Sequence, residues 1–176
     1  MTTAKERSGL VTLKGNPMTL LGPEVRVGDP APDFKLLDGS LAVVTLASSS
    51  GKVRVLSVVP SLDTPVCDQQ TKMLEEKAAG LPLSVAIYSV SVDLPFAQKR
   101  WCAAAESKRI VFLSDHREAS FGAAYGVLMK ENRLLARAVF VVGKDDRVKH
   151  VEIVKEVATL PDLDAAVRAA GAAAKG

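Results

Sequence analysis

Apolar residues along the chain fall alternately into short strand-like runs and into longer stretches with the three- and four-residue spacing of amphipathic helices. The run from Val53 to Val59 is dense in β-branched residues, which is typical of a central strand buried on both faces. The helix-length stretch after it ends at Gly80, a residue suited to the position that follows a helix. We therefore expect strands at 34–37, 41–46, 53–59, 83–90 and 111–113, and helices at about 65–79, 93–106, 118–125 and 161–170.

Turn-forming residues predict two β-hairpins, one on each side of this alternating region. Near the N-terminus, residues 11–20 contain the turn sequence Lys14-Gly15-Asn16. Near the C-terminus, the apolar runs 134–142 and 148–154 flank the turn at 143–146. Strand-helix-strand units followed by a hairpin and a final helix predict an α/β protein with a thioredoxin-like fold, in which helices flank a central mixed β-sheet and an N-terminal β-hairpin is added.

The composition narrows the range of functions. The 176 residues carry no internal repeat or long linker, so we expect a single domain over 1–176, with about 1–8 and 171–176 flexible. Aromatic residues make up 5% and the net charge of +3 is spread along the chain, which argues against a nucleic-acid partner. No apolar run approaches the roughly 18 residues of a membrane span, and no secretory signal is visible. We therefore expect a cytoplasmic protein with no membrane partner.

Cys67, one of only two cysteines, lies at the predicted start of a helix. Thr64 and Pro65 suit the N-cap and the first helical position, which places Cys67 in the first turn. Unpaired backbone N–H groups and the helix dipole favour an anion there, and the thiolate is the nucleophilic form of cysteine. The alternative is a small core side chain, as most intracellular cysteines are. Because Gln70 and Thr71 on the same side of the helix are polar, we expect the sulfur to lie beside the core rather than in it.

Cys102 lies in another predicted helix and could resolve an oxidised Cys67. Its neighbours three and four positions away include Gln98, Lys99 and Glu106, so we expect it on a surface-facing stripe, where an unreactive thiol is uncommon. The buried stripe of this helix is expected to contain Phe96, Ala103 and Ala104. The two cysteines lack Cys-x-x-Cys spacing, and no nucleotide-binding motif is present, so we expect neither a metal nor a cofactor.

Arg137 is the only charged residue in the apolar run 134–142. A guanidinium in such a strand either extends from an edge to solvent or pairs with a specific anion. A thiolate would be a suitable anion, so Arg137 is a candidate partner of a reactive cysteine.

Four segments in register resemble one family. The run 57–68, with the pattern Pro60-x-x-x-Thr64-x-x-Cys67, is similar to the active-site signature of peroxiredoxins and closely resembles that of bacterial thiol peroxidases, their atypical two-cysteine branch. Residues 93–102 resemble the family's resolving-cysteine segment, with Trp101 where phenylalanine is usual. Residues 134–139 resemble its active-site arginine strand, and 161–166 the start of its C-terminal helix.

This resemblance implies a peroxidase that needs no cofactor. Cys67 would attack a hydroperoxide, either hydrogen peroxide or an organic one, and become a sulfenic acid. Cys102 of the same subunit would then form a disulfide with it, and thioredoxin would reduce that disulfide. Pro60 would shield the thiolate, while Thr64 and Arg137 would hold it and polarise the peroxide. The resemblance also implies a homodimer.

Two other functions stay open from the sequence. A peroxide-sensing redox switch would use the same cysteines to signal to a partner protein. A thioredoxin-fold binding or chaperone module would leave both thiols idle. A disulfide also requires Cα atoms within about 7 Å of each other, which two helix-borne cysteines rarely achieve. We therefore expect local unwinding around Cys67, Cys102 or both in each turnover.

Overall fold

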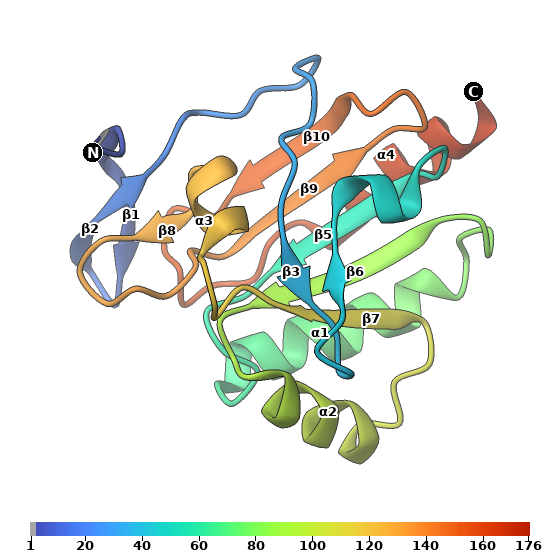
Figure 1. Ribbon diagram of the computed structural model, residues 1–176, viewed down its shortest axis with the longest axis horizontal. Helices are drawn as coiled ribbons and strands as arrows, with labels where there is room; N and C mark the ends of the chain where they lie inside the picture. Colours follow the sequence, from blue (N-terminus) through green and yellow to red (C-terminus); the bar gives the residue numbers. More distant parts are fainter. Residues whose placement is uncertain (1–2) are drawn as a thin grey trace.

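The computed structural model describes residues 3–176, which form a large and a small β-sheet, with helices packed on the large one (Figure 1). A seven-stranded mixed sheet has the strand order β10-β9-β5-β6-β7-β3-β4, and a three-stranded sheet has the order β1-β2-β8. The strands are β1 (Glu6–Leu13), β2 (Asn16–Leu21), β3 (Leu36–Leu37), β4 (Val43–Val44), β5 (Arg54–Val58), β6 (Ala86–Ser91), β7 (Ile110–Ser114), β8 (Leu128–Met129), β9 (Ala138–Val142) and β10 (Val148–Ile153). The helices are the 3-10 helix η1 (Leu46–Ser49), α1 (Pro65–Ala78), α2 (Pro95–Ala104), α3 (Ser120–Ala124) and α4 (Leu163–Lys175).

The large sheet confirms the predicted thioredoxin-like α/β fold. Strands β5, β6 and β7 are parallel and are connected through α1 and α2, while β9 pairs antiparallel with β5. Every residue of β5 is buried, because the strand lies inside the sheet and both of its faces are covered. The predicted hairpins are present as the pairs β1–β2 and β9–β10.

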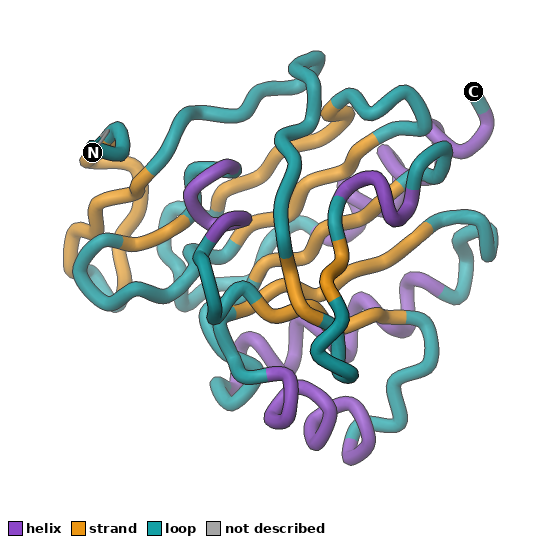
Figure 2. Tube along the Cα trace, in the orientation of Figure 1, coloured by secondary structure: helices purple, strands orange, loops and turns teal. Residues whose placement is uncertain are grey.

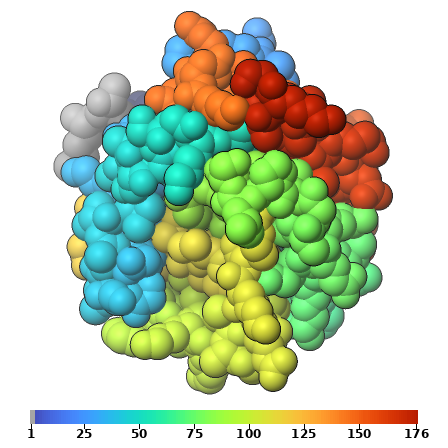
Figure 3. All heavy atoms as spheres, turned by 90° about the vertical axis from the view of Figure 1, so that its right-hand side faces the viewer, coloured from blue at the N-terminus to red at the C-terminus, as the bar shows by residue number. Residues whose placement is uncertain are grey.

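Helices cover both faces of the large sheet, as the purple and orange segments of Figure 2 show. In Figure 1, α3 and η1 lie in front of the sheet, and α1 and α4 lie behind it. Because side chains alternate along a strand, Val55 and Val139 face the helices behind, while Leu56 and Phe140 face the front. Seen from the side in Figure 3, α4 (red) lies against the green segment that includes the end of α1.

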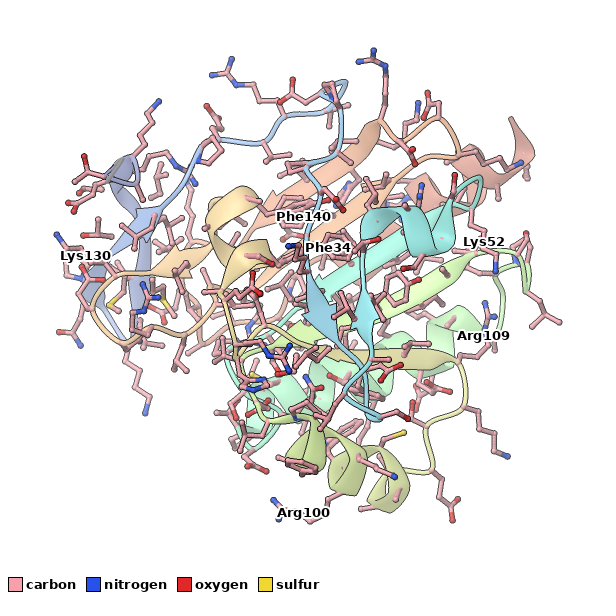
Figure 4. The ribbon with its side chains drawn as sticks, viewed as in Figure 1. Phe34, Lys52, Arg100, Arg109, Lys130 and Phe140 are labelled. Carbon is pink, nitrogen blue, oxygen red and sulfur yellow. The ribbon has the colours of Figure 1, made fainter. Side chains whose placement is uncertain are left out.

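The core in front of the sheet contains a cluster of packed aromatic rings. Phe121 and Tyr125 stack with ring centroids 4.2 Å apart, and Phe140 meets Tyr125 edge-on at 5.0 Å. Phe34 packs against Phe121 at 5.7 Å. In Figure 4, Phe34 and Phe140 lie together near the centre of the molecule, whereas the labelled lysine and arginine side chains lie at its rim.

Two expectations from the sequence are wrong, one about the start of a strand and one about the buried side of a helix. Strand β6 begins at Ala86 rather than at 83, and Leu83 is 86% exposed. In α2 the expected buried stripe is turned outward: Phe96 is 66% exposed, and Ala103 and Ala104 are exposed too. The helix instead buries Pro95 and Gln98, because the Gln98 side-chain amide donates hydrogen bonds to Ser91 Oγ and to the Leu113 carbonyl.

Regular structure extends further toward both ends of the chain than the sequence pattern indicated. Of the stretch 1–8, residues 1–2 lie outside the described residues, while Glu6 already belongs to β1. Arg7 is tied to the Gly22 and Gly126 carbonyls. At the other end, α4 continues to Lys175. No helix formed by the described residues is both long and apolar enough to cross a membrane.

Candidate active site

Cys67 lies in the first turn of α1, directly behind the end of β5. The Thr64 backbone is extended, as an N-cap requires, and Pro65 follows in the first turn, as predicted. The Thr64 carbonyl accepts the first helical hydrogen bond, from the Asp68 N–H. The short connection from β5 through Pro60 to α1 thus places the Cys67 side chain in the hydrophobic core behind the large sheet.

The sulfur is buried, contrary to the expectation that it lies beside the core. Cys67 has no exposed surface, and Gln70 and Thr71, whose polarity suggested an outward-facing stripe, are buried with it. Burial is possible because these polar groups are paired. Thr71 Oγ1 donates to the Cys67 carbonyl, and Gln70 bonds to Ser57 and Arg137.

Two hydrogen-bond donors approach the Cys67 sulfur from different elements. Thr64 Oγ1 lies 2.6 Å from Sγ, and Arg137 Nη2 lies 3.3 Å from it. The Thr64 hydroxyl is also 3.1 Å from the Ser61 carbonyl, so its single proton is shared between an oxygen and a sulfur acceptor. A cation and a hydroxyl are thus directed at one sulfur, where they can donate to negative charge that it carries during a reaction.

Arg137 is buried, with 2% of its surface exposed, so the alternative of an edge residue reaching into solvent is wrong. The residue directly precedes β9 and shares the rear face of the sheet with Val139. Besides its contact with Cys67, its Nε donates to the Val157 carbonyl at 2.7 Å and its Nη1 to Gln70 Oε1 at 2.8 Å. Each guanidinium nitrogen therefore has a partner.

An open, mainly apolar pocket of about 460 Å³ is lined by both residues that donate to this sulfur, while the buried sulfur itself is not part of its lining. Its lining includes Pro60, Thr64, Val66, Leu134 and Arg137. It can therefore hold a small molecule with an apolar part, while the donors on Thr64 and Arg137 lie at its polar end. The structure thus brings four of the five predicted site residues, namely Pro60, Thr64, Cys67 and Arg137, to one place.

The N-terminal hairpin forms one wall of the pocket through Leu13 and Lys14. Glu156 fastens this wall: its carboxylate accepts hydrogen bonds from Thr12 Oγ1 and from the backbone N–H groups of Lys14 and Gly15. These donors, together with the N–H of Ala158, lower the pKa of Glu156 to about 2. The next residue, Val157, accepts from Arg137, so the same segment supports both the wall and the guanidinium.

Cys102, the fifth predicted residue, is not brought to this sulfur. Both cysteines are free, and Cys102 lines a separate pocket with residues that include Asp38, Lys99 and Phe112. It is half-buried, and its sulfur lies 3.7 Å from the Ser107 carbonyl. Burial, and secondarily the nearby Glu75 carboxylate, raise the pKa of the Cys102 thiol.

Sequence reasoning missed Gln70 and misjudged Asp93. Gln70 links Arg137 to Ser57, and its position one turn after Cys67 could have indicated this, because both residues must then face the same way. Asp93, the first residue of the helix expected at 93–106, lies one residue before the observed N-cap, Leu94. Its carboxylate instead accepts from Ser61 Oγ and from the Leu62 N–H, and so ties the loop before Cys67 to the start of α2.

The chain resembles known proteins over nearly its whole length. Residues 26–167 match the Redoxin family. A thiol peroxidase of Halalkalibacterium halodurans is 58% identical over 93% of this chain and 98% of its own, and a thiol peroxidase of Bacillus subtilis is 50% identical over 94% and 98%. A crystal structure of a peroxiredoxin-like protein from Aquifex aeolicus superposes with a TM-score of 0.85 at 40% identity, covering 92% of this chain and 96% of the other. Among residues 3–176, no three His, Cys, Asp or Glu side chains gather in a way that could hold a metal ion.

Proposed function

We propose that this chain, which belongs to the Redoxin family and within it to the thiol peroxidases, reduces hydroperoxides through Cys67 and is recycled through Cys102. Family membership supports the reaction class, which is thiol-dependent peroxide reduction. One observation carries the assignment of residues: the buried Cys67 sulfur lies between the Thr64 hydroxyl and the Arg137 guanidinium, beside a pocket large enough for a hydroperoxide.

In the first step, the Cys67 thiolate attacks the distal oxygen of the hydroperoxide. The O–O bond breaks as the S–O bond forms, which gives a sulfenic acid and an alkoxide or hydroxide that takes up a proton. Negative charge moves from sulfur to the leaving oxygen in this step. Thr64 and Arg137 already direct their donors at the sulfur, so they can follow that charge onto the peroxide oxygens. Pro60, which lines the pocket, limits the access of water to the sulfur.

In the second step, the Cys102 sulfur attacks the sulfenic sulfur of Cys67 in the same subunit. The S–S bond forms as the S–O bond breaks, and the departing oxygen leaves as water with the thiol proton. A dithiol reductant of the thioredoxin type then reduces the disulfide by thiol–disulfide exchange. Because the Cys67 thiol is buried and the Cys102 thiol lines a pocket that Cys67 does not share, the second step requires local unwinding around one or both cysteines.

The pocket supports a range of substrates. Hydrogen peroxide needs only the polar end formed by Thr64 and Arg137. The apolar lining, with Val66 and Leu134 among its residues, offers a surface for the carbon chain of an organic hydroperoxide. We therefore include both kinds of hydroperoxide among the substrates.

Three further features belong to the proposal. A cycle that depends on a thioredoxin-type reductant requires a reducing compartment, which favours the cytoplasm. Family resemblance supports a homodimer, which sedimentation equilibrium would test. The two packed sheets and their shared helices support a single domain over 1–176, which a single cooperative unfolding transition would test.

The decisive experiment treats the reduced protein with one equivalent of hydrogen peroxide and maps the products by non-reducing peptide mass spectrometry. Cys67→Ser and Cys102→Ser are treated in parallel. We expect an intramolecular Cys67–Cys102 disulfide in the unmodified chain and a trappable sulfenic acid at Cys67 in Cys102→Ser. Unmodified thiols, or oxidation at Cys102 alone, would show that the assigned roles are wrong. Sustained turnover with thioredoxin would distinguish the enzyme from a peroxide-sensing switch.

A further inference from the structure

A single hydrogen bond joins the two cysteine-bearing helices directly beside their cysteines. Trp101 Nε1 donates to Asp68 Oδ1 at 3.0 Å. Asp68 is the residue after Cys67, and Trp101 is the residue before Cys102. In Figure 1, α1 lies behind the large sheet and α2 lies at the bottom of the view; this hydrogen bond connects them.

Both partners of this bond are themselves held in place. The Trp101 ring packs against Phe112 of β7, with ring centroids 5.4 Å apart. The second carboxylate oxygen of Asp68 forms an ion pair with Lys72 at 2.8 Å, one turn further along α1. The bond therefore connects two side chains that other contacts have already oriented, so it costs little additional ordering to form.

This contact and the disulfide exclude each other while the helices are intact. Successive side chains on a helix point about 100° apart, so α1 and α2 cannot direct Asp68 at Trp101 and Cys67 at Cys102 at the same time. In the structure described above the first arrangement is present: Cys67 is buried, and Cys102 lines a pocket to which Cys67 does not contribute. The Asp68–Trp101 bond consequently stabilises the arrangement of the helices in which the sulfurs cannot meet, and it opposes the local unwinding that would bring them together.

We propose that Asp68 and Trp101 form a latch that sets the rate at which the oxidised Cys67 is resolved. The inference rests on the proposed function, in which Cys102 displaces the oxygen of the Cys67 sulfenic acid. A closed latch keeps the sulfenic acid in its pocket beside Thr64 and Arg137. There a second hydroperoxide can oxidise it to a sulfinic acid, which the thioredoxin-type reductant cannot reverse. By positioning the two helices, the latch thus determines which fraction of the sulfenic acid becomes disulfide and which fraction becomes sulfinic acid.

Two variants open the latch from opposite sides. Trp101→Phe removes the N–H donor and keeps a ring against Phe112, and Asp68→Ala removes the acceptor. Because the Asp68 carboxylate is partly exposed to solvent, its bond to Trp101 should have the strength of an ordinary hydrogen bond, whose loss corresponds to roughly a five- to tenfold change in an equilibrium. We therefore expect disulfide formation to become about five- to tenfold faster in both, with a matching fall in the sulfinic-to-disulfide ratio at a fixed excess of hydrogen peroxide. The rate of sulfenic acid formation should stay unchanged.

Two matched variants separate the latch from charge and from general loosening. Asp68→Asn keeps an oxygen acceptor for Trp101, and Lys72→Met removes the ion pair but keeps the carboxylate. Both should stay within about twofold of the unmodified chain. The measurement is rapid quenching followed by mass spectrometry of the Cys67 peptide, which counts sulfenic acid, disulfide and sulfinic acid separately.

The single tryptophan provides a second measurement on the unmodified protein, so the test does not depend on how the variants fold. Trp101 fluorescence should change with the rate constant of disulfide formation and not with that of sulfenic acid formation. Unchanged or slower disulfide formation in both opening variants, or fluorescence that follows the first step, would overturn the latch. If the unmodified chain forms no disulfide at all, the proposed function fails instead, and the two failures are thereby distinguished.

Discussion

Arg137 is positioned by three elements that are distant in the sequence. Its guanidinium contacts Cys67 and Gln70 of α1 and the Val157 carbonyl in the segment after β10, while its own backbone leads into β9. The planar fork of arginine can make these three contacts at once. Lysine places its donors on one rotating nitrogen and cannot reach the same three acceptors in this geometry.

Replacing Arg137 by lysine should therefore slow the reaction of Cys67 with peroxide while the positive charge is retained. The loss of a donor directed at developing charge typically costs about 100-fold in rate, and we expect that order of effect. Stopped-flow measurement of thiol oxidation by hydrogen peroxide at pH 7 checks it. Arg54→Lys is the matched control, because Arg54 is also a buried strand arginine, held on the other face by Ser49 and the Gly143 carbonyl. A rate within threefold of the unmodified chain in Arg137→Lys would refute the assigned role.

Gln70 should contribute to stability as well as to the site. Its replacement by leucine leaves a guanidinium N–H of Arg137 and the Ser57 hydroxyl without their present partners inside the core. Unpaired buried polar groups of this kind cost about 1–3 kcal/mol of unfolding free energy. Gln69→Leu, the same change on the exposed side of α1, should stay within about 0.5 kcal/mol. Urea unfolding of the reduced proteins measures both, and equal effects would contradict the proposed Gln70 contribution.

At the scale of elements, the N-terminal hairpin is held against the pocket by Glu156. The pKa of this carboxyl is lowered to about 2 by hydrogen bonds from Thr12, Gly15, Lys14 and Ala158. A group whose pKa is lower in the folded than in the unfolded chain adds stability above its unfolded pKa of about 4.5, and that stability is lost as the pH falls toward its folded value. The attachment of the hairpin should therefore weaken in acid.

Glu156→Gln should reproduce at neutral pH part of what acid does to the unmodified chain. The amide offers one oxygen and directs an NH₂ group at donors, so it cannot accept all the hydrogen bonds of the carboxylate. The stability difference between the two proteins should be largest above pH 4.5 and should shrink as the pH falls toward 2. Urea unfolding at a series of pH values measures it, with the exposed Glu76→Gln as the control for removal of a surface charge. A difference that stays constant over this range would speak against the role of Glu156.

Short-range chemistry explains which elements could be predicted from the sequence. The start of α1 was predicted correctly because Thr64 and Pro65 determine it within a few residues. The burial of Cys67 could not be predicted in the same way. It depends on Arg137, a residue distant in sequence that pairs with the polar face of the helix. The two-residue strand β8, which was missed, is present because it pairs with β2, and its own sequence carries no strand-length pattern.

At the scale of the whole molecule, one buried carboxyl should affect folding stability in the direction opposite to Glu156, whose contribution is lost as the pH falls. Asp115, at the end of β7, accepts hydrogen bonds from the backbone N–H groups of Phe121 and Gly122 at the start of α3. Burial outweighs these bonds and raises its pKa from 3.8 to about 6. A group whose pKa is raised on folding adds stability below its unfolded pKa, and that stability is lost as the pH rises through the folded value. Asp115 and Glu156 therefore act in opposite directions.

Asparagine does not titrate, so replacing Asp115 by asparagine should remove the contribution of this carboxyl to the pH dependence of the global unfolding free energy. A pKa raised from 3.8 to about 6 corresponds to roughly 3 kcal/mol, so the unmodified chain should lose up to that amount relative to Asp115→Asn as the pH rises from about 4 to 6. Below pH 4 the difference between the two proteins should be constant. Urea unfolding at several pH values measures it, and carbon-13 NMR of the Asp115 carboxyl should titrate with a midpoint of about 6. A midpoint near 4, with a difference that does not depend on pH, would show that α3 holds this carboxylate ionised and that burial is not the dominant influence.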